Sequence, residues 1–275
     1  MKFSNRITRI IVSVLAIPVL LAISIVGKIP FFLMMLLISV IAFNEYSKML
    51  SNKRIIVNRF IGTLAIIAVF FQAYFKWVEV SMLILSITLL LLLIELFHNK
   101  QSAINNLGGT LLGVFFIGMF SSTTINIREF YGENILLYNQ GGYLISSIFI
   151  TIWMCDSAAY FLGTAFGKHR LFLRVSPKKS WEGAIAGFIF SIISMSALKI
   201  IILDFFSWQD VIIIGIIIGI FGQIGDLVES LMKRDAGVKD SSSIIPGHGG
   251  ILDRFDSLIF VAPIIYFYLY FFVKY

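Results

Sequence analysis

The sequence predicts an all-α polytopic membrane protein with about nine transmembrane helices. Hydrophobic residues make up 59% of the 275 residues and charged residues only 13%, and the mean hydropathy is +0.94. Soluble domains lie far from these values, because they need polar side chains to cover their surface. Long apolar runs recur along the whole chain, so we expect one integral membrane domain over residues 1–275.

The predicted spans are apolar segments of about 17 to 25 residues, which is the length that crosses a bilayer. They lie near 10–27, 30–46, 60–76, 80–97, 103–121, 143–165, 182–203, 209–232 and 256–273. The N-terminal helices occupy about 1–121 and the helices that carry the chemistry about 143–275. The first segment has the layout of a signal peptide, but no small-x-small cleavage site follows it, so we interpret it as the first span.

The distribution of basic residues sets the orientation. With a cytoplasmic N-terminus, 17 of the 22 Lys and Arg residues fall on the cytoplasmic side, as the positive-inside rule requires. An odd number of spans then places the C-terminus on the opposite side. The net charge of +7 fits anionic headgroups, and no basic tail or aromatic-basic module indicates nucleic acid. The single Cys155 excludes an intramolecular disulfide and is interpreted as a small buried hydrophobe.

The first polar group of residues lies between Asp156 and Gly183. Asp156 sits inside an apolar segment, where a carboxylate needs a polar cavity or a partner. A basic loop follows, with Ser176, Lys178 and Lys179 leading directly into a new helix. A basic turn at a helix N-terminus is suited to phosphate, although such a loop can also merely bind headgroups.

The second group is a block of charge over residues 226–256, wedged between two apolar runs. If the eighth helix continues, its polar residues share one face, namely Asp226, Glu229, Ser230 and Lys233. The chain then passes Lys239, Asp240 and a run of serines before the turn that contains His248, Gly249 and Gly250. It re-enters the membrane with Asp253, Arg254 and Asp256. The glycines would allow the backbone to approach a ligand closely, and we expect His248 to contact that ligand.

These residue types favour magnesium over zinc, because they offer hard oxygen ligands, no Cys and one nearby His. Magnesium together with Lys and Arg is suited to transfer reactions on phosphorus. The alternative interpretation is a loop of mutually neutralising ion pairs.

The block closely resembles the signature of the phosphatidate cytidylyltransferases, also called CDP-diacylglycerol synthases. Its positions are met by Ser230, Lys233, Arg234, Lys239, Asp240, His248, Gly249, Gly250, Asp253, Arg254 and Asp256. A second block of the family resembles Asp156, Ala159, Tyr160 and 176–183. The likeness covers the C-terminal half well, whereas the N-terminal half matches only in hydropathy and gives no site residue.

The resemblance implies a magnesium-dependent reaction of CTP with phosphatidic acid that yields CDP-diacylglycerol and pyrophosphate. It also implies an enzyme of the bacterial inner (plasma) membrane that acts as a homodimer, with its site facing the cytoplasm. Asp226 and Asp253 would be the leading metal ligands, with Asp256 a third ligand or an outer partner. A second, monovalent cation such as K+ is compatible with the same site.

The remaining roles are implied by the same likeness. The triphosphate and pyrophosphate would be held by Lys233, Arg234, Lys239 and Arg254. The basic loop, with Ser176, Lys178 and Lys179, would hold the lipid phosphate or close the nucleotide pocket, and both possibilities stay open. Ser230, Gly249, Gly250 and Asp156 would line the substrates.

Two other functions remain alternatives at this stage. A CTP-dependent kinase of a lipid alcohol would use related groups but would benefit from a general base. A transporter or channel could line an ion path with Asp156 and Asp226, although the polar residues gather at one membrane face rather than along a route across it.

Overall fold

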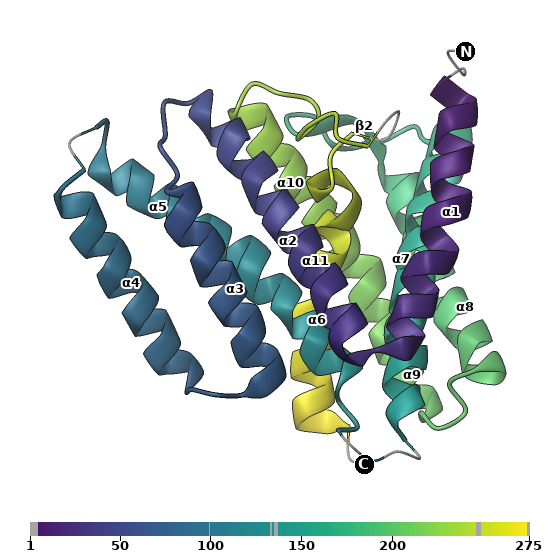
Figure 1. The fold of residues 1–275 in the computed structure, drawn as a ribbon. Coiled ribbons are helices and arrows are strands. Elements are labelled where there is room, and N and C mark those ends of the chain that lie inside the picture. The colour runs from purple at the N-terminus through teal and green to yellow at the C-terminus, as the bar shows by residue number, and fades with distance from the viewer. Residues whose placement is uncertain (1–4, 99, 133, 135–136, 246–248, 274–275) are drawn as a thin grey trace.

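The computed structural model describes residues 5–98, 100–132, 134, 137–245 and 249–273. These residues form a bundle of helices with one small hairpin (Figure 1). The elements are α1 (Asn5–Val26), α2 (Lys28–Ser51), α3 (Arg59–Phe75), α4 (Val80–Leu96), α5 (Ala103–Gly113), η1 (Val114–Met119), α6 (Phe120–Arg128), α7 (Tyr138–Phe166), β1 (Arg170–Phe172), β2 (Ser176–Ser180), α8 (Trp181–Ile201), α9 (Trp208–Ile217), η2 (Ile218–Gly222), α10 (Gln223–Asp235) and α11 (Leu252–Phe272).

Six helical segments are long and apolar enough to cross a membrane: Lys28–Ser51, Ala103–Arg128, Tyr138–Phe166, Trp181–Ile201, Trp208–Asp235 and Leu252–Phe272. Three shorter apolar helices cover Ser13–Val26, Arg59–Phe75 and Val80–Leu96. Many large apolar side chains point outward, among them Phe60, Leu85 and Ile193, and hydrocarbon is the solvent that accommodates them. The prediction of an all-α membrane protein is confirmed, and each predicted segment coincides with a helical segment.

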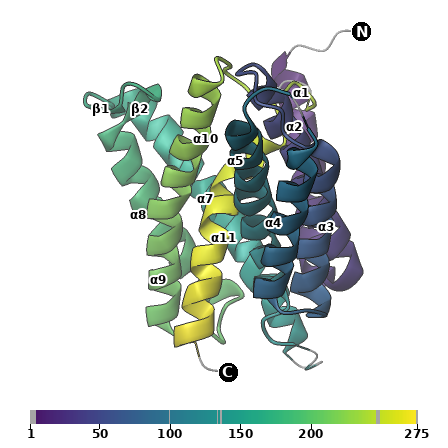
Figure 2. The ribbon, with the colours of Figure 1, turned by 90° about the vertical axis from the view of Figure 1, so that its left-hand side faces the viewer.

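The arrangement places α2, α10 and α11 in the middle of the bundle, with α3 and α4 on one side and α7, α8 and α9 on the other (Figure 1). The first turn of α1 and the last turn of α11 lie at opposite ends of the bundle, as Figure 2 shows from a second direction. The hairpin and the C-terminal end of α10 lie at the same end as the start of α1. The hairpin and the end of α10, which carry predicted site residues, therefore lie at one end of the bundle.

The fifth helical segment is longer than predicted, because α5, η1 and α6 run on to Arg128 rather than ending near residue 121. The hydroxyls of its polar run find partners within the helix, because they donate to carbonyls one turn back, as Ser122 does to Met119 (2.8 Å) and Thr124 to Ser121 (2.6 Å). Arg128 ends the segment buried, with its guanidinium donating to backbone carbonyls of α1.

Small-xxx-small glycine pairs lie where neighbouring helices approach each other closely. A Cβ on Gly183 would lie 2.6 Å from the carbonyl oxygen of Ala159, and one on Gly187 would lie 3.0 Å from that of Cys155. Gly215 likewise faces the backbone of α8. These contacts let α7, α8 and α9 pack closely. Cys155 is buried and free, which confirms its interpretation as a small hydrophobe.

The basic loop departs from the all-α expectation, because it forms an antiparallel hairpin in which β1 pairs with β2. Glu182, in the first turn of α8, holds the preceding segment by accepting from the backbone N–H of Lys168 (3.1 Å) and from Nδ1 of His169 (2.6 Å). Ser180 caps α8 by accepting from the N–H of Gly183 (3.2 Å). The hairpin is thus fixed at both ends and extends over α10.

Candidate active site

The two polar groups of the sequence meet at one place in the bundle. Asp156 of α7 lies within electrostatic reach of Asp226 of α10, Lys179 of β2 and Arg254 of α11. Lys179 also forms an ion pair with Asp226. Residues that are up to about a hundred positions apart in the chain therefore form one site, as the resemblance implied.

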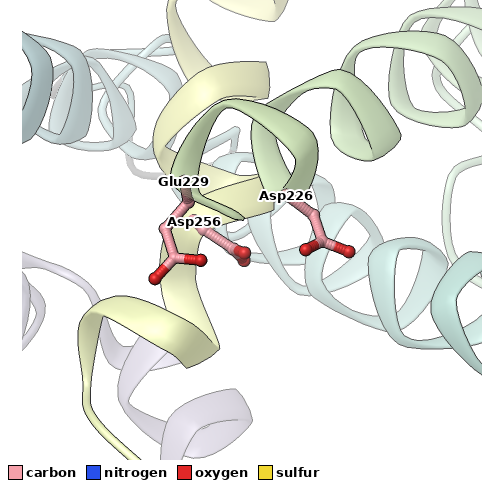
Figure 3. A group of neighbouring side chains, drawn as sticks. All are labelled: Asp226, Glu229 and Asp256. Atoms are coloured by element: carbon pink, nitrogen blue, oxygen red, sulfur yellow. The ribbon is translucent and has the colours of Figure 1, made fainter. Parts of the chain in front are cut away.

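Three carboxylates form the centre of this site. One oxygen each of Asp226, Glu229 and Asp256 lies within 4.8 Å of the others. Asp226 and Glu229 are three residues apart on α10, and Asp256 faces them from α11 (Figure 3). Glu229 is completely buried and Asp256 nearly so. The prediction that the polar residues of α10 share one face is confirmed, because α10 is continuous through all of them.

Two lysines offset part of the negative charge. The ammonium of Lys233 lies 2.5 Å from Oε2 of Glu229 and 2.6 Å from Oδ1 of Asp253. Lys179 approaches Asp226 from the hairpin. Among the described residues, neither oxygen of Glu229 accepts a hydrogen bond. Its contact with Lys233 is an ion pair only.

This arrangement fits a bound divalent cation. A buried carboxylate without hydrogen bonds is costly, and three carboxylates within a few ångströms repel one another. Hard oxygen ligands of this kind suit Mg²⁺. The group that fits a cation consists of Asp226, Glu229 and Asp256. The sequence analysis placed Glu229 on the same helix face as Asp226 but did not name it as a metal ligand. Its spacing of three residues from Asp226 was the available signal.

Asp253 has a different environment from the three clustered carboxylates. Its Oδ2 accepts from the N–H of Gly250 (2.8 Å) and from both the N–H and the hydroxyl of Ser241 (3.0 and 2.9 Å), while Oδ1 contacts Lys233. The carboxylate thus joins the loop after α10 to the start of α11. Its role as a metal ligand stays a prediction.

Glu45 lies on α2, and its side chain contacts the polar loop between α10 and α11. The sequence analysis did not identify it. Its carboxylate is buried and accepts from the hydroxyls of Ser241 (3.1 Å) and Ser242 (2.5 Å). It also accepts from the backbone N–H groups of Ile251 (3.0 Å) and Leu252 (2.8 Å), at the start of α11. The N-terminal half therefore does contribute to the site. No local pattern marks Glu45, because its partners are about 200 residues away.

Gly249 and Gly250 allow close approach within the protein itself. Gly249 has φ +88°, and a Cβ on Gly250 would lie 1.9 Å from the hydroxyl of Ser241 and 2.6 Å from Oε2 of Glu45. Among the described residues the carboxylate and serine network approaches these glycines, and the close approach of a ligand stays a prediction.

The other predicted site residues surround this centre. Arg234 holds the hairpin, since its Nε donates to the carbonyl of Val175 (3.3 Å). Ser230 lies behind Asp226, with 3.4 Å between their side-chain oxygens. The exposed members are Lys178, Lys239, Asp240 and Arg254, and Ser176 is half-buried. His248 lies outside the described residues.

A pocket of about 420 Å³ opens beside the carboxylates, between α1, α7 and α11. Its polar end is formed by Asp156, Asp253, Arg254 and Asp256. Its other walls are apolar and include Leu20, Phe149, Ile152, Trp153 and Leu258. The pocket is thus amphipathic, with its charged end next to the candidate cation site.

The comparison with known proteins identifies the family. The model of the cytidylyltransferase family matches residues 7–272. The chain belongs to the cytidylyltransferase family. It is 33% identical over 268 residues to the phosphatidate cytidylyltransferase of Bacillus subtilis (strain 168), which covers 95% of this chain and 96% of the relative. It is 34% identical over 261 residues to the phosphatidate cytidylyltransferase of Staphylococcus haemolyticus (strain JCSC1435), with 94% and 96% covered.

Family membership shows that the chain is a nucleotidyltransferase, and it confirms the resemblance inferred from the signature residues. The match spans both halves of the chain. This agrees with a cytidylyltransferase site to which α2, in the N-terminal half, contributes Glu45.

Replacing Glu45 with Gln is expected to loosen the polar loop. The amide keeps one acceptor oxygen and loses the charge that strengthens its four hydrogen bonds. Hydrogen–deuterium exchange over residues 241–252 should become at least about tenfold faster, since losing about 1.4 kcal/mol changes an opening equilibrium tenfold. Glu79→Gln, which alters an exposed carboxylate, is the matched control. Unchanged exchange in Glu45→Gln would contradict the role of Glu45 in holding the loop.

Replacing Gly250 with Ala is expected to destabilise the protein by about 1 to 3 kcal/mol, because the new methyl group overlaps Ser241 and Glu45. Thermal unfolding in detergent measures the effect. Gly108→Ala is the control, since nothing lies within 4 Å of a Cβ at that helical position. If both variants unfold at the wild-type temperature, the packing around Gly250 is not as described.

Proposed function

We propose that this protein transfers CMP from CTP to phosphatidic acid, giving CDP-diacylglycerol and pyrophosphate in phospholipid biosynthesis. The observation that carries the proposal is the amphipathic pocket, whose charged end adjoins a carboxylate cluster suited to a cation. The family supplies the class of transfer, and the relatives named phosphatidate cytidylyltransferase supply the acceptor.

The pocket accounts for the lipid substrate. Phosphatidic acid has an anionic phosphate monoester and two acyl chains. The apolar walls formed by α1 and α7 suit the chains, and Arg254 at the polar end suits the phosphate. The pocket lies between helices that face the bilayer, so a lipid could enter sideways without leaving the membrane.

The basic residues at the same end of the bundle account for the nucleotide. The reaction brings a phosphate monoester against the α-phosphorus of CTP, so two anions must meet and a third must leave. Exposed Lys178 and Lys239 can bind the phosphates from the aqueous side. The acceptor phosphate is already ionised near neutral pH, so the chain need not supply a strong general base, and its task is to bind and orient the two substrates.

We further propose that Mg²⁺ is held by Asp226, Glu229 and Asp256. When bound, the ion would offset the negative charge on the phosphates and on the departing pyrophosphate. Lys179 pairs with Asp226 and would have to share that carboxylate with the ion. Asp253 would then support the site through Lys233 and the loop of Ser241, rather than by direct ligation. A monovalent cation in the same site remains a further proposal.

An assay with radiolabelled CTP tests the reaction. Cytidine label should enter the organic phase only when phosphatidic acid and magnesium are both present, and EDTA should abolish its entry. Asp256→Asn should lower the rate at least about a hundredfold, as expected when a charge acting on the transferring group is lost. Asp204→Asn removes an exposed carboxylate and should leave the rate unchanged.

Two results would argue against these assignments. Label transferred to a lipid alcohol instead of phosphatidic acid would indicate a lipid kinase or another acceptor. An Asp256→Asn enzyme with the wild-type rate at limiting magnesium would remove Asp256 from the cation site.

For the topology we propose nine spans, with the N-terminus in the cytoplasm and the C-terminus on the opposite side of a bacterial inner membrane. Among the described residues, six long and three shorter apolar helices support this arrangement, as do the opposite positions of the first turn of α1 and the last turn of α11. The charged site would then face the cytoplasm, where CTP is found. From the family likeness we also propose that the protein acts as a homodimer of single-domain chains.

Cysteine labelling in intact cells tests the topology, starting from a Cys155→Ser background. A cysteine at Glu79 should react with a membrane-impermeant maleimide from outside the cell. A cysteine at Ser51, which lies at the end of the bundle that carries the site, should react only after permeabilisation. Both positions are exposed, so labelling of both from the same side would contradict the proposed arrangement.

A further inference from the structure

A second cavity of about 660 Å³ lies in the N-terminal half of the protein. It occurs where the connection between α2 and α3 meets the connection between α4 and α5. Its lining consists of Ser47, Ser51, Arg54, Ile55, Ile56, Val57, Asn58, Arg59, His98 and Gln101. None of these residues lines the pocket beside the carboxylates, so the cavity is separate from the proposed catalytic site.

A buried hydrogen-bond network fixes the shape of this cavity. The side chain of Asn106 is buried, and its Oδ1 accepts from the N–H of Ile56 (2.8 Å) while its Nδ2 donates to Oε1 of Glu95 (2.8 Å). One turn later, Thr110 accepts from the N–H of Asn58 (3.0 Å). These bonds tie the connection after α2 to α4 and α5, so the walls are held in place by three elements.

The cavity presents positive charge. Arg54 and Arg59 line it together with His98, and Nε of Arg59 donates to the hydroxyl of Ser47 (2.7 Å). Within the part of the chain that the structure describes, neither arginine is paired with a carboxylate. The N-terminus of α3, capped by Asn58, adds its positive dipole end. Glu95 is buried, and its two oxygens contact Asn106 (2.8 Å) and Nδ1 of His98 (3.4 Å), so the positive charge open to a ligand comes from the two guanidinium groups.

Apolar side chains stand next to this charge. Phe60 directly follows Arg59 and is 73% exposed, and Phe97 directly precedes His98 and is 85% exposed. Phe60 lies in the first turn of α3, and Phe97 directly follows the last residue of α4. Basic pockets between transmembrane helices at the aqueous boundary suit anionic headgroups, and the neighbouring phenylalanines suit hydrocarbon.

We propose that this cavity binds a phosphate group, as a second site outside the one that carries out the reaction. The guanidinium groups of Arg54 and Arg59 would bind the phosphate oxygens. The phosphate belongs either to the headgroup of an anionic membrane lipid or to a free phosphate in solution. The adjacent apolar side chains lead us to expect the lipid.

Two features connect this second cavity to the catalytic half of the protein. Ser47, the hydroxyl partner of Arg59, is two residues along α2 from Glu45, which holds the loop before α11. Lys53, in the same connection as Arg54, lies 3.1 Å from Asp235 at the end of α10. An occupied cavity would therefore adjoin the elements that position the carboxylates.

Binding can be measured on the purified full chain without relying on activity. The lipid arm titrates dioleoylphosphatidylglycerol into detergent-solubilised protein and counts bound lipids by native mass spectrometry. The second arm adds inorganic phosphate alone and follows thermal unfolding. The Arg54→Gln/Arg59→Gln variant should bind one lipid fewer, with affinity at that site reduced at least about tenfold, whereas Arg54→Lys/Arg59→Lys should retain much of the binding.

The control variant is Lys48→Gln/Lys100→Gln, which removes the same charge from exposed positions outside the cavity. If wild type and Arg54→Gln/Arg59→Gln differ in the effect of inorganic phosphate but bind the lipid equally, the ligand is a free phosphate. The proposal is overturned if both probes bind wild type and variant equally, or if the control loses as much binding. Arg54→Gln alone, which alters an exposed side chain without a hydrogen bond among the described residues, serves if the double variant aggregates.

Discussion

The constraint on which the site depends is the concentration of negative charge between α10 and α11. Asp226, Glu229 and Asp256 lie within a few ångströms of one another, and Glu229 and Asp256 are buried. Like charges at this separation repel one another unless cations compensate them or a carboxyl group takes up a proton. Two lysines do so in part. Lys233 comes from α10 itself, whereas Lys179 is supplied by the hairpin. The hairpin therefore has a structural reason to fold over α10.

A second carboxylate system holds this centre in place. Glu45 binds the start of α11 and the serines before it, and Asp253 binds the same segment from the other side. Backbone N–H groups at the start of a helix are natural partners for a carboxylate. Because Glu45 lies on α2, the position of Asp256 depends on the N-terminal helices. The division into N-terminal helices and catalytic helices is thus not a division between scaffold and site.

The two cavities differ in the charge of the side chains that line them. The pocket beside α11 combines carboxylates with Arg254, so the proposed anionic substrates would need a cation to meet there. The cavity where the α2–α3 and α4–α5 connections meet carries Arg54 and Arg59, so a phosphate could bind there directly. Both lie at the end of the bundle where the charged connections gather. Anionic substrates and anionic lipids would therefore reach the protein at one membrane face.

The sequence by itself determined that the protein lies in a membrane, which segments are helical and which class of reaction the site residues suit. The length of the apolar runs located the helical segments, since about 20 apolar residues are needed to cross a bilayer. The spacing of Asp226, Glu229 and Lys233 predicted that they share one face of a helix. Only the tertiary structure decided which carboxylates meet. Glu229 lies with Asp226 and Asp256, while Asp253 contacts Lys233 and Ser241, and its predicted role as a metal ligand stays a prediction. Glu45 could not be found from sequence, because local periodicity carries no information about a partner about 200 residues away.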